Sequence, residues 1–133
     1  MIKKTITYTD FNEETRTEPH YFHLSRAELV EMDATTVGGY KAMVEKAAQD
    51  GDTPTLFKIV KNFVVSSYGK KSLDGKTFKK SPEITEEFIQ SEAYSELLIE
   101  LLSDAQVASD FINGIVNSVT STKGETSVIA SGN

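Results

Sequence analysis

The first 24 residues alternate apolar and polar side chains in two short runs. β-Branched and aromatic residues occupy position 2 and positions 5–8, and a second extended run covers 15–24. Turn-forming polar residues at 10–14 separate the two runs, and this arrangement predicts a β-hairpin. Pro19 cannot donate a hydrogen bond to a neighbouring strand, so the second strand is expected to be an edge strand or to begin late.

From residue 25 onward, apolar residues recur with the spacing of amphipathic helices. Ser25 and Glu28 form a capping box that predicts a helix to about residue 32. A second helix is expected from Tyr40 to near residue 51. The dipeptide 53–54, Thr-Pro, predicts a third, with the threonine as its N-cap and Gly69 as its C-cap.

The segment 68–80 reads as a lysine-rich loop around the tight-turn dipeptide at 74–75. Ser81 and Pro82 then predict the start of another helix, and two further amphipathic segments follow before residue 117. The last 17 residues, 117–133, lose helical periodicity and are rich in Ser, Thr and Gly.

These elements predict an α+β fold that is mostly α. One globular domain is expected over residues 1–116, with the β-hairpin at 1–24 and about five to six short amphipathic helices in a small bundle at 25–116. A flexible tail is expected at 117–133, in which the short apolar segment 128–130 could dock onto another surface.

Composition excludes several classes of protein. The 133 residues contain no cysteine, which rules out disulfide frameworks, thiolate nucleophiles and Cys-ligated metal centres and favours a reducing compartment. No run of about 18 apolar residues occurs, and the first residues lack the apolar core of a signal peptide. A cytoplasmic protein that is neither exported nor bound to a membrane is therefore expected.

The net charge of −6 is divided unevenly along the chain. Residues 53–80 carry seven Lys or Arg and one acidic residue, whereas residues 81–116 carry eight acidic residues and no Lys or Arg. This asymmetry bears on the choice of partner rather than on the fold. A basic segment that meets an acidic face, of the same chain or of a second copy, accounts for it.

Candidate chemistry along the chain is sparse. His20 and His23 are three residues apart on an expected strand, so their side chains point to opposite faces and do not jointly hold a metal. The glutamates after residue 82 have the spacing of solvated helix faces, and no serine lies in a nucleophile motif. The sequence thus predicts a non-enzymatic protein, with no catalytic residue, metal or cofactor.

The segment 69–77 resembles a phosphate-binding loop, but it has five residues between its glycines instead of four and follows an expected helix. Its lysines, with Tyr68 and Phe78 beside them, would also suit phosphate contacts to nucleic acid. The acidic pI of about 4.9 argues against nucleic acid as the main partner.

Protein surfaces remain as the candidate site. The apolar stripes of the C-terminal helices are expected mainly to form the protein's own core. A groove among them that stays partly open would accept an amphipathic helix or an apolar strand from another protein. The residues predicted to make this apolar contact are Leu97, Leu98, Leu101, Phe111, Ile112 and Ile115.

The amino-acid sequences of three segments, and their order along the chain, add a family resemblance. MIKKTITYTDFNEE, then YFHLSRAELVEM, then the stretch from LFKIVKNFVVSSYGKKSLDGKTFKKSP to SDAQVASDFINGIV resemble the small tail assembly chaperones of long-tailed bacteriophages and of prophages of Gram-positive bacteria. The resemblance covers about residues 1–116. It implies a helper protein in the cytoplasm of the infected cell that coats the hydrophobic tape measure protein and recruits tail tube subunits.

In that family a ribosomal frameshift often adds a C-terminal domain to a longer form, in which case the present tail would end the short form. Copies are expected to stack head to tail along the tape measure protein. The residues predicted to make this charged contact are Lys70, Lys71, Lys79 and Lys80 against Glu92, Glu96 and Glu100. Two alternatives stay open at this point, a structural or connector protein of the phage tail and a small nucleic-acid-associated regulator.

Overall fold

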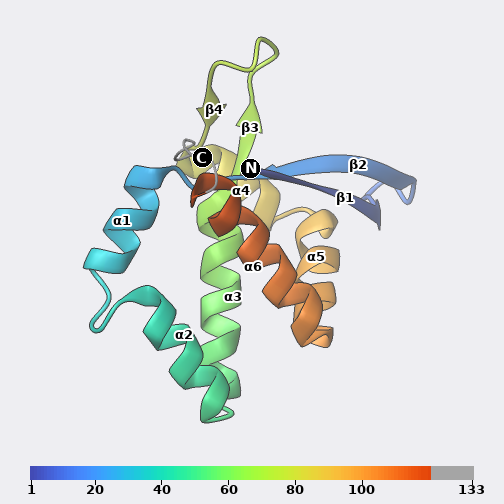
Figure 1. The fold of residues 1–133 in the computed structure, drawn as a ribbon. Helices are drawn as coiled ribbons and strands as arrows, with labels where there is room; N and C mark the ends of the chain where they lie inside the picture. Colours follow the sequence, from blue (N-terminus) through green and yellow to red (C-terminus); the bar gives the residue numbers. More distant parts are fainter. Residues whose placement is uncertain (121–133) are drawn as a thin grey trace.

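The computed structural model describes residues 1–120, and side chains to residue 116. In this part of the chain, two strands precede three helices, a second pair of strands follows, and three more helices complete the fold (Figure 1). The elements are β1 (Ile2–Thr9), β2 (Thr15–Phe22), α1 (Arg26–Ala34), α2 (Tyr40–Gln49), α3 (Thr53–Ser67), β3 (Tyr68–Lys71), β4 (Phe78–Lys79), α4 (Pro82–Ile89), α5 (Glu92–Ser103) and α6 (Ala105–Thr120). The predicted fold class, α+β and mostly α, is confirmed.

The sheet is larger than the predicted hairpin. It has four antiparallel strands in the order β1-β2-β3-β4. β1 and β2 pair along their whole length, whereas β3 pairs with β2 only through Tyr68 and Gly69. The expectation that β2 would be an edge strand or begin late is wrong, because β2 begins at Thr15 and lies between β1 and β3. Pro19 lies opposite Thr5 of β1, outside the β2–β3 pairing, so the ladder tolerates its missing N–H group. Part of the expected lysine-rich loop therefore forms strands.

Helix starts follow the capping signals, with one correction. The Ser25 hydroxyl accepts a hydrogen bond from the Glu28 N–H at 3.1 Å, and the Ser25 N–H donates to the Glu28 carboxylate at 2.8 Å. Helix α3 is capped by Asp52 rather than by the expected Thr53, because its carboxylate accepts from the Thr55 N–H at 3.2 Å.

The ends of two helices also differ from the prediction. Gly69 does not cap α3, because the backbone is already extended at Tyr68 and continues as β3. Helix α6 runs to Thr120, four positions into the segment expected to be tail. The remainder of that segment, 121–133, lies outside the described residues, and the division into a domain at 1–116 and a tail stays a prediction.

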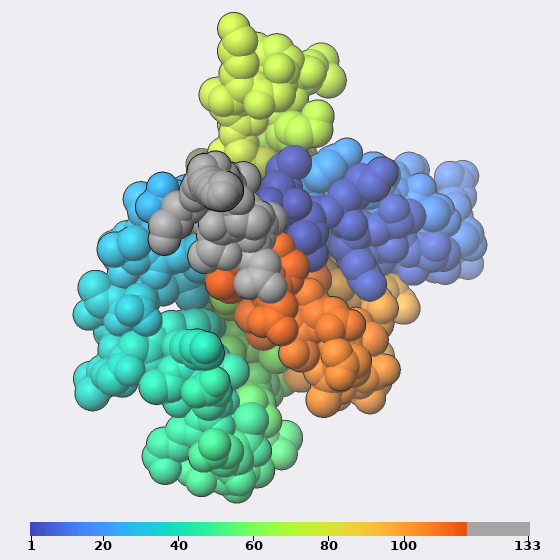
Figure 2. Space-filling view, viewed as in Figure 1, coloured from blue at the N-terminus to red at the C-terminus, as the bar shows by residue number. Residues whose placement is uncertain are grey.

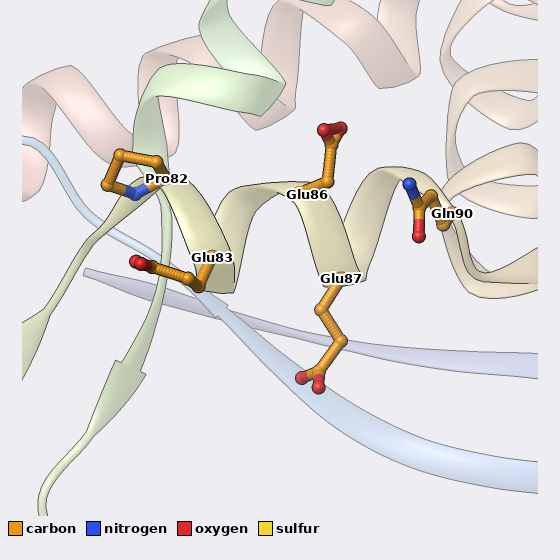
Figure 3. Close-up of a pocket in the computed structure, with 5 residues that line it drawn as sticks. All are labelled: Pro82, Glu83, Glu86, Glu87 and Gln90. Atoms are coloured by element: carbon orange, nitrogen blue, oxygen red, sulfur yellow. The ribbon is translucent and has the colours of Figure 1, made fainter.

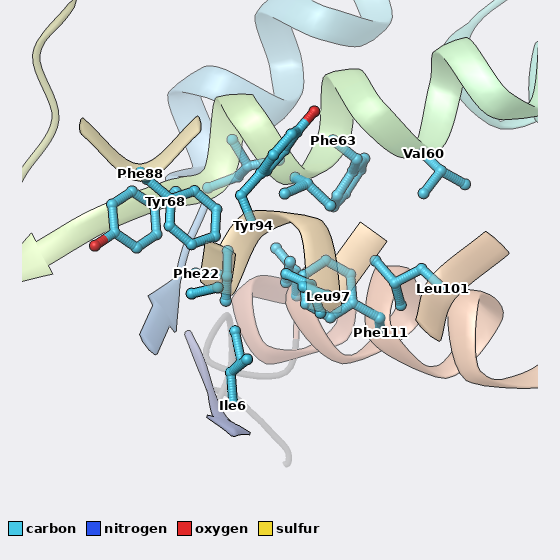
Figure 4. Close-up of a cluster of buried hydrophobic side chains, with 14 residues drawn as sticks. Ile6, Phe22, Val60, Phe63, Tyr68, Phe88, Tyr94, Leu97, Leu101 and Phe111 are labelled. Carbon is cyan, nitrogen blue, oxygen red and sulfur yellow. The ribbon is translucent and has the colours of Figure 1, made fainter. Parts of the chain in front are cut away.

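Aromatic and aliphatic side chains from the sheet and the helices share one buried cluster, shown in Figure 4. The rings of Tyr68 and Phe88 stack with their centroids 4.0 Å apart, and Phe22 packs edge-on against Phe111 at 5.1 Å. Helix α3 supplies Phe63, which is almost completely buried. The cluster fixes α3, α5 and α6 against the inner face of the sheet.

Candidate partner-binding cleft

A cleft of about 670 Å³ lies between α2, α3, α5 and α6. Figure 2 shows the hollow between α2 (teal) and α6 (orange), with α3 (green) visible between them. Most of its lining is apolar. The lining residues are Val44, Ala48, Thr53, Pro54, Leu56, Phe57, Ile59, Val60, Leu101, Leu102, Ala105, Ala108, Ser109, Ile112 and Asn113.

The sequence builds this cleft by placing small residues where two helices face each other. Ala48 of α2 and the pair Ala105 and Ala108 of α6 reach only a short distance from their backbones. Side chains of this size leave room that a leucine or phenylalanine would fill. Helix α3 is apolar on more than one side, so it supplies Phe63 to the core and Phe57 to the cleft.

Two large apolar side chains remain open to solvent along the lining. Phe57 of α3 is 39% exposed and Leu102 of α5 is 46% exposed. A single exposed apolar residue is ordinary on a protein surface, but two that border one apolar cleft form a continuous patch. Such a patch marks a surface suited to contact with another molecule.

The apolar residues predicted for partner contact divide into two groups. Leu97, Leu101, Phe111 and Ile115 are buried and belong to the core. Leu98 and Ile112 are partly exposed. Only Leu101 and Ile112 of the six line the cleft. A role for the six in partner contact stays a prediction, and Leu97, Phe111 and Ile115 are placed to support the cleft from within.

The lysines predicted for self-association gather on the β3–β4 hairpin, which projects from the top of the view in Figure 1. Lys70 and Lys79 lie opposite each other across the two strands. The ammonium of Lys70 donates to the Glu87 carboxylate of α4 at 3.1 Å, and this hydrogen bond raises the pKa of Lys70. Lys71 lies 5.8 Å from the ring centroid of Tyr21.

The predicted acidic partners Glu92, Glu96 and Glu100 lie on α5 and are exposed. Glu100 pairs with Lys4 of β1 at 2.9 Å. Lys80 pairs instead with Glu28 of α1 at 2.8 Å. Within one copy, the pairs formed by Lys70 and Lys80 thus join α4 and α1 to the hairpin, and the predicted contact with α5 of a second copy stays a prediction.

A shallow acidic hollow of about 520 Å³ lies along α4 (Figure 3). Its residues all come from one helix and its C-cap, and their side chains spread apart, with Glu86 on the opposite side of the helix from Glu83 and Glu87. Glu87 is already paired with Lys70. The surface does not enclose a ligand.

The two histidines pack against aromatic rings. His20 contacts Phe88 with ring centroids 5.6 Å apart, and His23 contacts Phe78 at 5.7 Å. Among residues 1–120, no three His, Asp or Glu side chains gather in a way that would hold a metal ion. No helix in this part of the chain is both long and apolar enough to cross a bilayer.

An open apolar cleft between amphipathic helices is the arrangement by which many proteins receive a helix of a partner. The fold and the cleft therefore define a small α+β protein with an open apolar cleft between its helices. Comparison with known families then identifies the protein family. The model of the phage tail assembly chaperone family matches residues 1–124, and the chain belongs to that family. No curated protein and no solved structure shows a significant match.

Proposed function

We propose that this chain binds the tape measure protein of its phage through the cleft between α2, α3, α5 and α6. The observation that carries the proposal is the solvent-open apolar lining, with Phe57 and Leu102 exposed, on a member of a tail assembly chaperone family. A long helical protein with apolar stripes aggregates unless those stripes are covered. The chaperone covers them by a non-catalytic contact in the host cytoplasm.

The dimensions of the cleft suit a few side chains of an amphipathic helix. Its volume, about 670 Å³, lies within the range of roughly 300–1,000 Å³ of sites that bury most of a small ligand. Residues at positions i, i+3, i+4 and i+7 of a helix project from one face and would enter together. The hydroxyl of Ser109 and the amide of Asn113 lie at the cleft to pair with polar groups of the partner.

One cleft alone gives weak binding. Phe57 and Leu102 are already more than half covered, so burying the rest of each contributes about 1 kcal/mol. A long partner with many apolar segments binds many copies, and contacts between neighbouring copies then raise the overall affinity. The weak binding expected from one cleft therefore favours many chaperone copies along the tape measure protein over a single bound copy.

Contacts between neighbouring copies are proposed to use charge. The hairpin lysines, above all the exposed Lys71 and Lys79, meet Glu92 and Glu96 on α5 of the next copy. The coated tape measure protein then recruits tail tube subunits. Because exposed ion pairs are screened by salt, the copy-to-copy contact is expected to weaken at high ionic strength, which size-exclusion chromatography across salt concentrations measures.

Co-expression with the tape measure protein tests the proposal. Phe57→Glu and Leu102→Glu place a carboxylate in the apolar lining, where its desolvation opposes binding. The fraction of soluble tape measure protein is expected to fall about ten-fold, which corresponds to a loss of roughly 1.4 kcal/mol. The matched control is Ile99→Glu, because Ile99 is 60% exposed on α5 but does not line the cleft.

Thermal unfolding by circular dichroism checks that all three variants fold. Equal solubilisation by wild type, Phe57→Glu and Leu102→Glu would contradict the assignment of the cleft. A wild-type chain that neither co-purifies with the tape measure protein nor raises its solubility would overturn the proposed function itself. Presence of the chain in purified virions would favour a structural or connector role instead.

A further inference from the structure

The tip of the β3–β4 hairpin presents an uncovered leucine. Leu73 is fully exposed, and it lies in a turn that other residues hold. The Ser72 N–H donates to the Thr77 carbonyl at 2.9 Å, and the Asp74 carboxylate accepts from the Lys76 N–H at 3.0 Å. Leu73 therefore contributes an apolar side chain that the turn itself does not need.

The base of the hairpin holds this tip in a fixed position. The buried Gly69 packs so tightly against β4 that an added Cβ would lie 2.7 Å from the Lys79 carbonyl oxygen. The His23 N–H donates to the Ser67 carbonyl at 2.7 Å, which ties the end of α3 to the chain after β2. An apolar group held in one place loses less conformational entropy when it binds.

The tip and the cleft lie at opposite ends of α3. The first half of α3, up to Val60, lines the cleft, and its last residue, Ser67, leads directly into β3. A helix of 15 residues is about 22 Å long. Figure 1 shows the hairpin at the top and the start of α3 at the bottom. Leu73 is thus directed away from the cleft of its own chain and reaches only that of another copy.

The charges beside the tip and beside the cleft are complementary. Lys71 and Lys76 flank Leu73 within three positions. The cleft wall formed by α5 and α6 belongs to the stretch 81–116, which has eight acidic residues and no Lys or Arg. Its exposed Glu100, Asp104 and Asp110 each adjoin a lining residue in the sequence. The opposite wall, formed by α2 and α3, carries Lys41, Lys46, Lys58 and Lys61, of which Lys46 pairs with Asp50 at 3.0 Å. The charge match therefore applies to the α5–α6 wall.

We propose that, when no tape measure protein is bound, the Leu73 tip of one copy occupies the apolar cleft of a second copy. The inference rests on the cleft being the partner site of the proposed function. The contact joins two different surfaces, so it leaves a free cleft at one end and a free tip at the other and builds open chains rather than closed dimers. The tape measure helix competes for the same cleft and releases the copies.

Sedimentation velocity of the full chain, without any other phage protein, tests this contact. The average mass of the wild type is expected to rise with protein concentration above the 14.7 kDa of one copy. Leu73→Ser removes the apolar tip and is expected to weaken association about ten-fold or more. Val37→Ser is the matched control, because Val37 is equally exposed but lies between α1 and α2.

A second variant blocks the other side of the contact. Ala48 is an exposed residue of the cleft lining, so Ala48→Trp fills the mouth without disturbing the core. Alone, Ala48→Trp is expected to associate about ten-fold or more weakly than the wild type, like Leu73→Ser. Mixed together, the two variants form a 1:1 pair that grows no further, because one keeps the cleft and the other keeps the tip.

Wild-type chains that stay monomeric, Leu73→Ser chains that associate as the wild type does, or variants that fail to pair when mixed would each overturn the inference. The proposed function fails by a different result. Leu73→Ser leaves the cleft intact and is expected to solubilise the tape measure protein as well as the wild type does. The co-expression experiment measures binding of the tape measure protein by the wild type, and sedimentation measures self-association, so either proposal can fail without the other.

Discussion

At the scale of single residues, Lys80 shows how an ordinary surface side chain becomes part of the framework. Its ammonium donates to the Glu28 carboxylate at 2.8 Å and 2.9 Å, to the His23 carbonyl at 2.9 Å and to the Ser66 carbonyl at 3.0 Å. Burial alone would raise the pKa of Glu28, but the hydrogen bonds from Lys80 and from the Ser25 N–H lower it. One cation thus joins the end of the hairpin to α1 and α3.

Replacing this cation is expected to destabilise the fold. Lys80→Met keeps the length of the side chain but leaves a partly buried carboxylate and two carbonyls without their donor, at a cost of about 2–3 kcal/mol. Urea unfolding measures the loss. Lys79→Met is the control, because Lys79 is the exposed neighbour of Lys80 at the end of β4, and it is expected to change the free energy of unfolding by less than about 0.5 kcal/mol. Equal losses would contradict the role of Lys80.

The sequence predicted Lys80 only as one of four lysines for contact with another copy. Its spacing cannot distinguish it from Lys79, because both follow Phe78 in a polar stretch. The distinction depends on residues that are 52 and 57 positions away in the chain. Interactions over such separations exist only once the fold has formed.

At the scale of elements, the β3–β4 hairpin depends on Gly69. A Cβ at this position would lie 2.5 Å from the Phe78 ring and 2.7 Å from the Lys79 carbonyl oxygen, so the two strands must move apart. Gly69→Ala is therefore expected to lower the free energy of unfolding by about 2–3 kcal/mol. It is also expected to disorder the tip and so reduce self-association.

The matched control is Gly114→Ala in α6, where the added methyl meets only the Ile2 side chain, at 3.2 Å. The Cγ2 methyl of Ile2 must move by only a few tenths of an ångström, and alanine favours the helix by about 1 kcal/mol. Chemical unfolding and hydrogen exchange at the hairpin amides measure both variants. A Gly69→Ala chain as stable as the wild type would show that the strands separate at little cost.

Elements were predictable where local signals decide them. Capping at Ser25 and Ser81 and regular apolar spacing identified the helices, because both operate within one or two turns. The short strands β3 and β4 were missed, since their lysines and Gly69 have low strand propensity and β3 pairs with the distant β2 as well as with β4. A partly open groove was expected among the C-terminal helices alone. The walls that α2 and α3 contribute were missed, because small residues such as Ala48 show no gap until two helices are placed side by side.

At the scale of the whole molecule, ionisable groups favour folding near neutral pH. Burial lowers the pKa of His20 and His23 from the usual value near 6.5, although Glu18 and Glu28 respectively act in the opposite sense. The pKa values of Asp10 and Asp52 are also lowered, in both cases chiefly by side-chain hydrogen bonds, from Arg16 and Thr55. Each of these groups binds a proton more readily in the unfolded chain.

Stability is therefore expected to fall as the pH drops. A histidine with a lowered folded pKa contributes its full stability above its unfolded pKa of about 6.5, and this contribution is lost as the pH falls below that value. The stability contributed by Asp10 and Asp52 is lost at lower pH, as the pH falls below their unfolded pKa of about 3.9. Urea unfolding between pH 7.5 and 5 measures the contribution of the histidines. The urea concentration at the unfolding midpoint is expected to decline over this range.

The variant His20→Phe identifies the source of the first step. Phenylalanine keeps the ring among Tyr8, Tyr68 and Phe88 but binds no proton. The slope of stability against pH between about 7 and 5.5 is expected to decrease, and His23 supplies what remains. An unchanged slope would contradict the assignment to His20.

The direct passage from α3 into β3 has a mechanical consequence. The Tyr68 N–H donates to the Val64 carbonyl while the Tyr68 backbone is already extended, so helix and strand meet without a linker that could stretch. A pull on the hairpin is therefore transmitted directly to the end of α3 and is resisted by the short pairing of β3 with β2. The opposite end of α3, which lines the cleft, would then move together with the hairpin as one rigid unit.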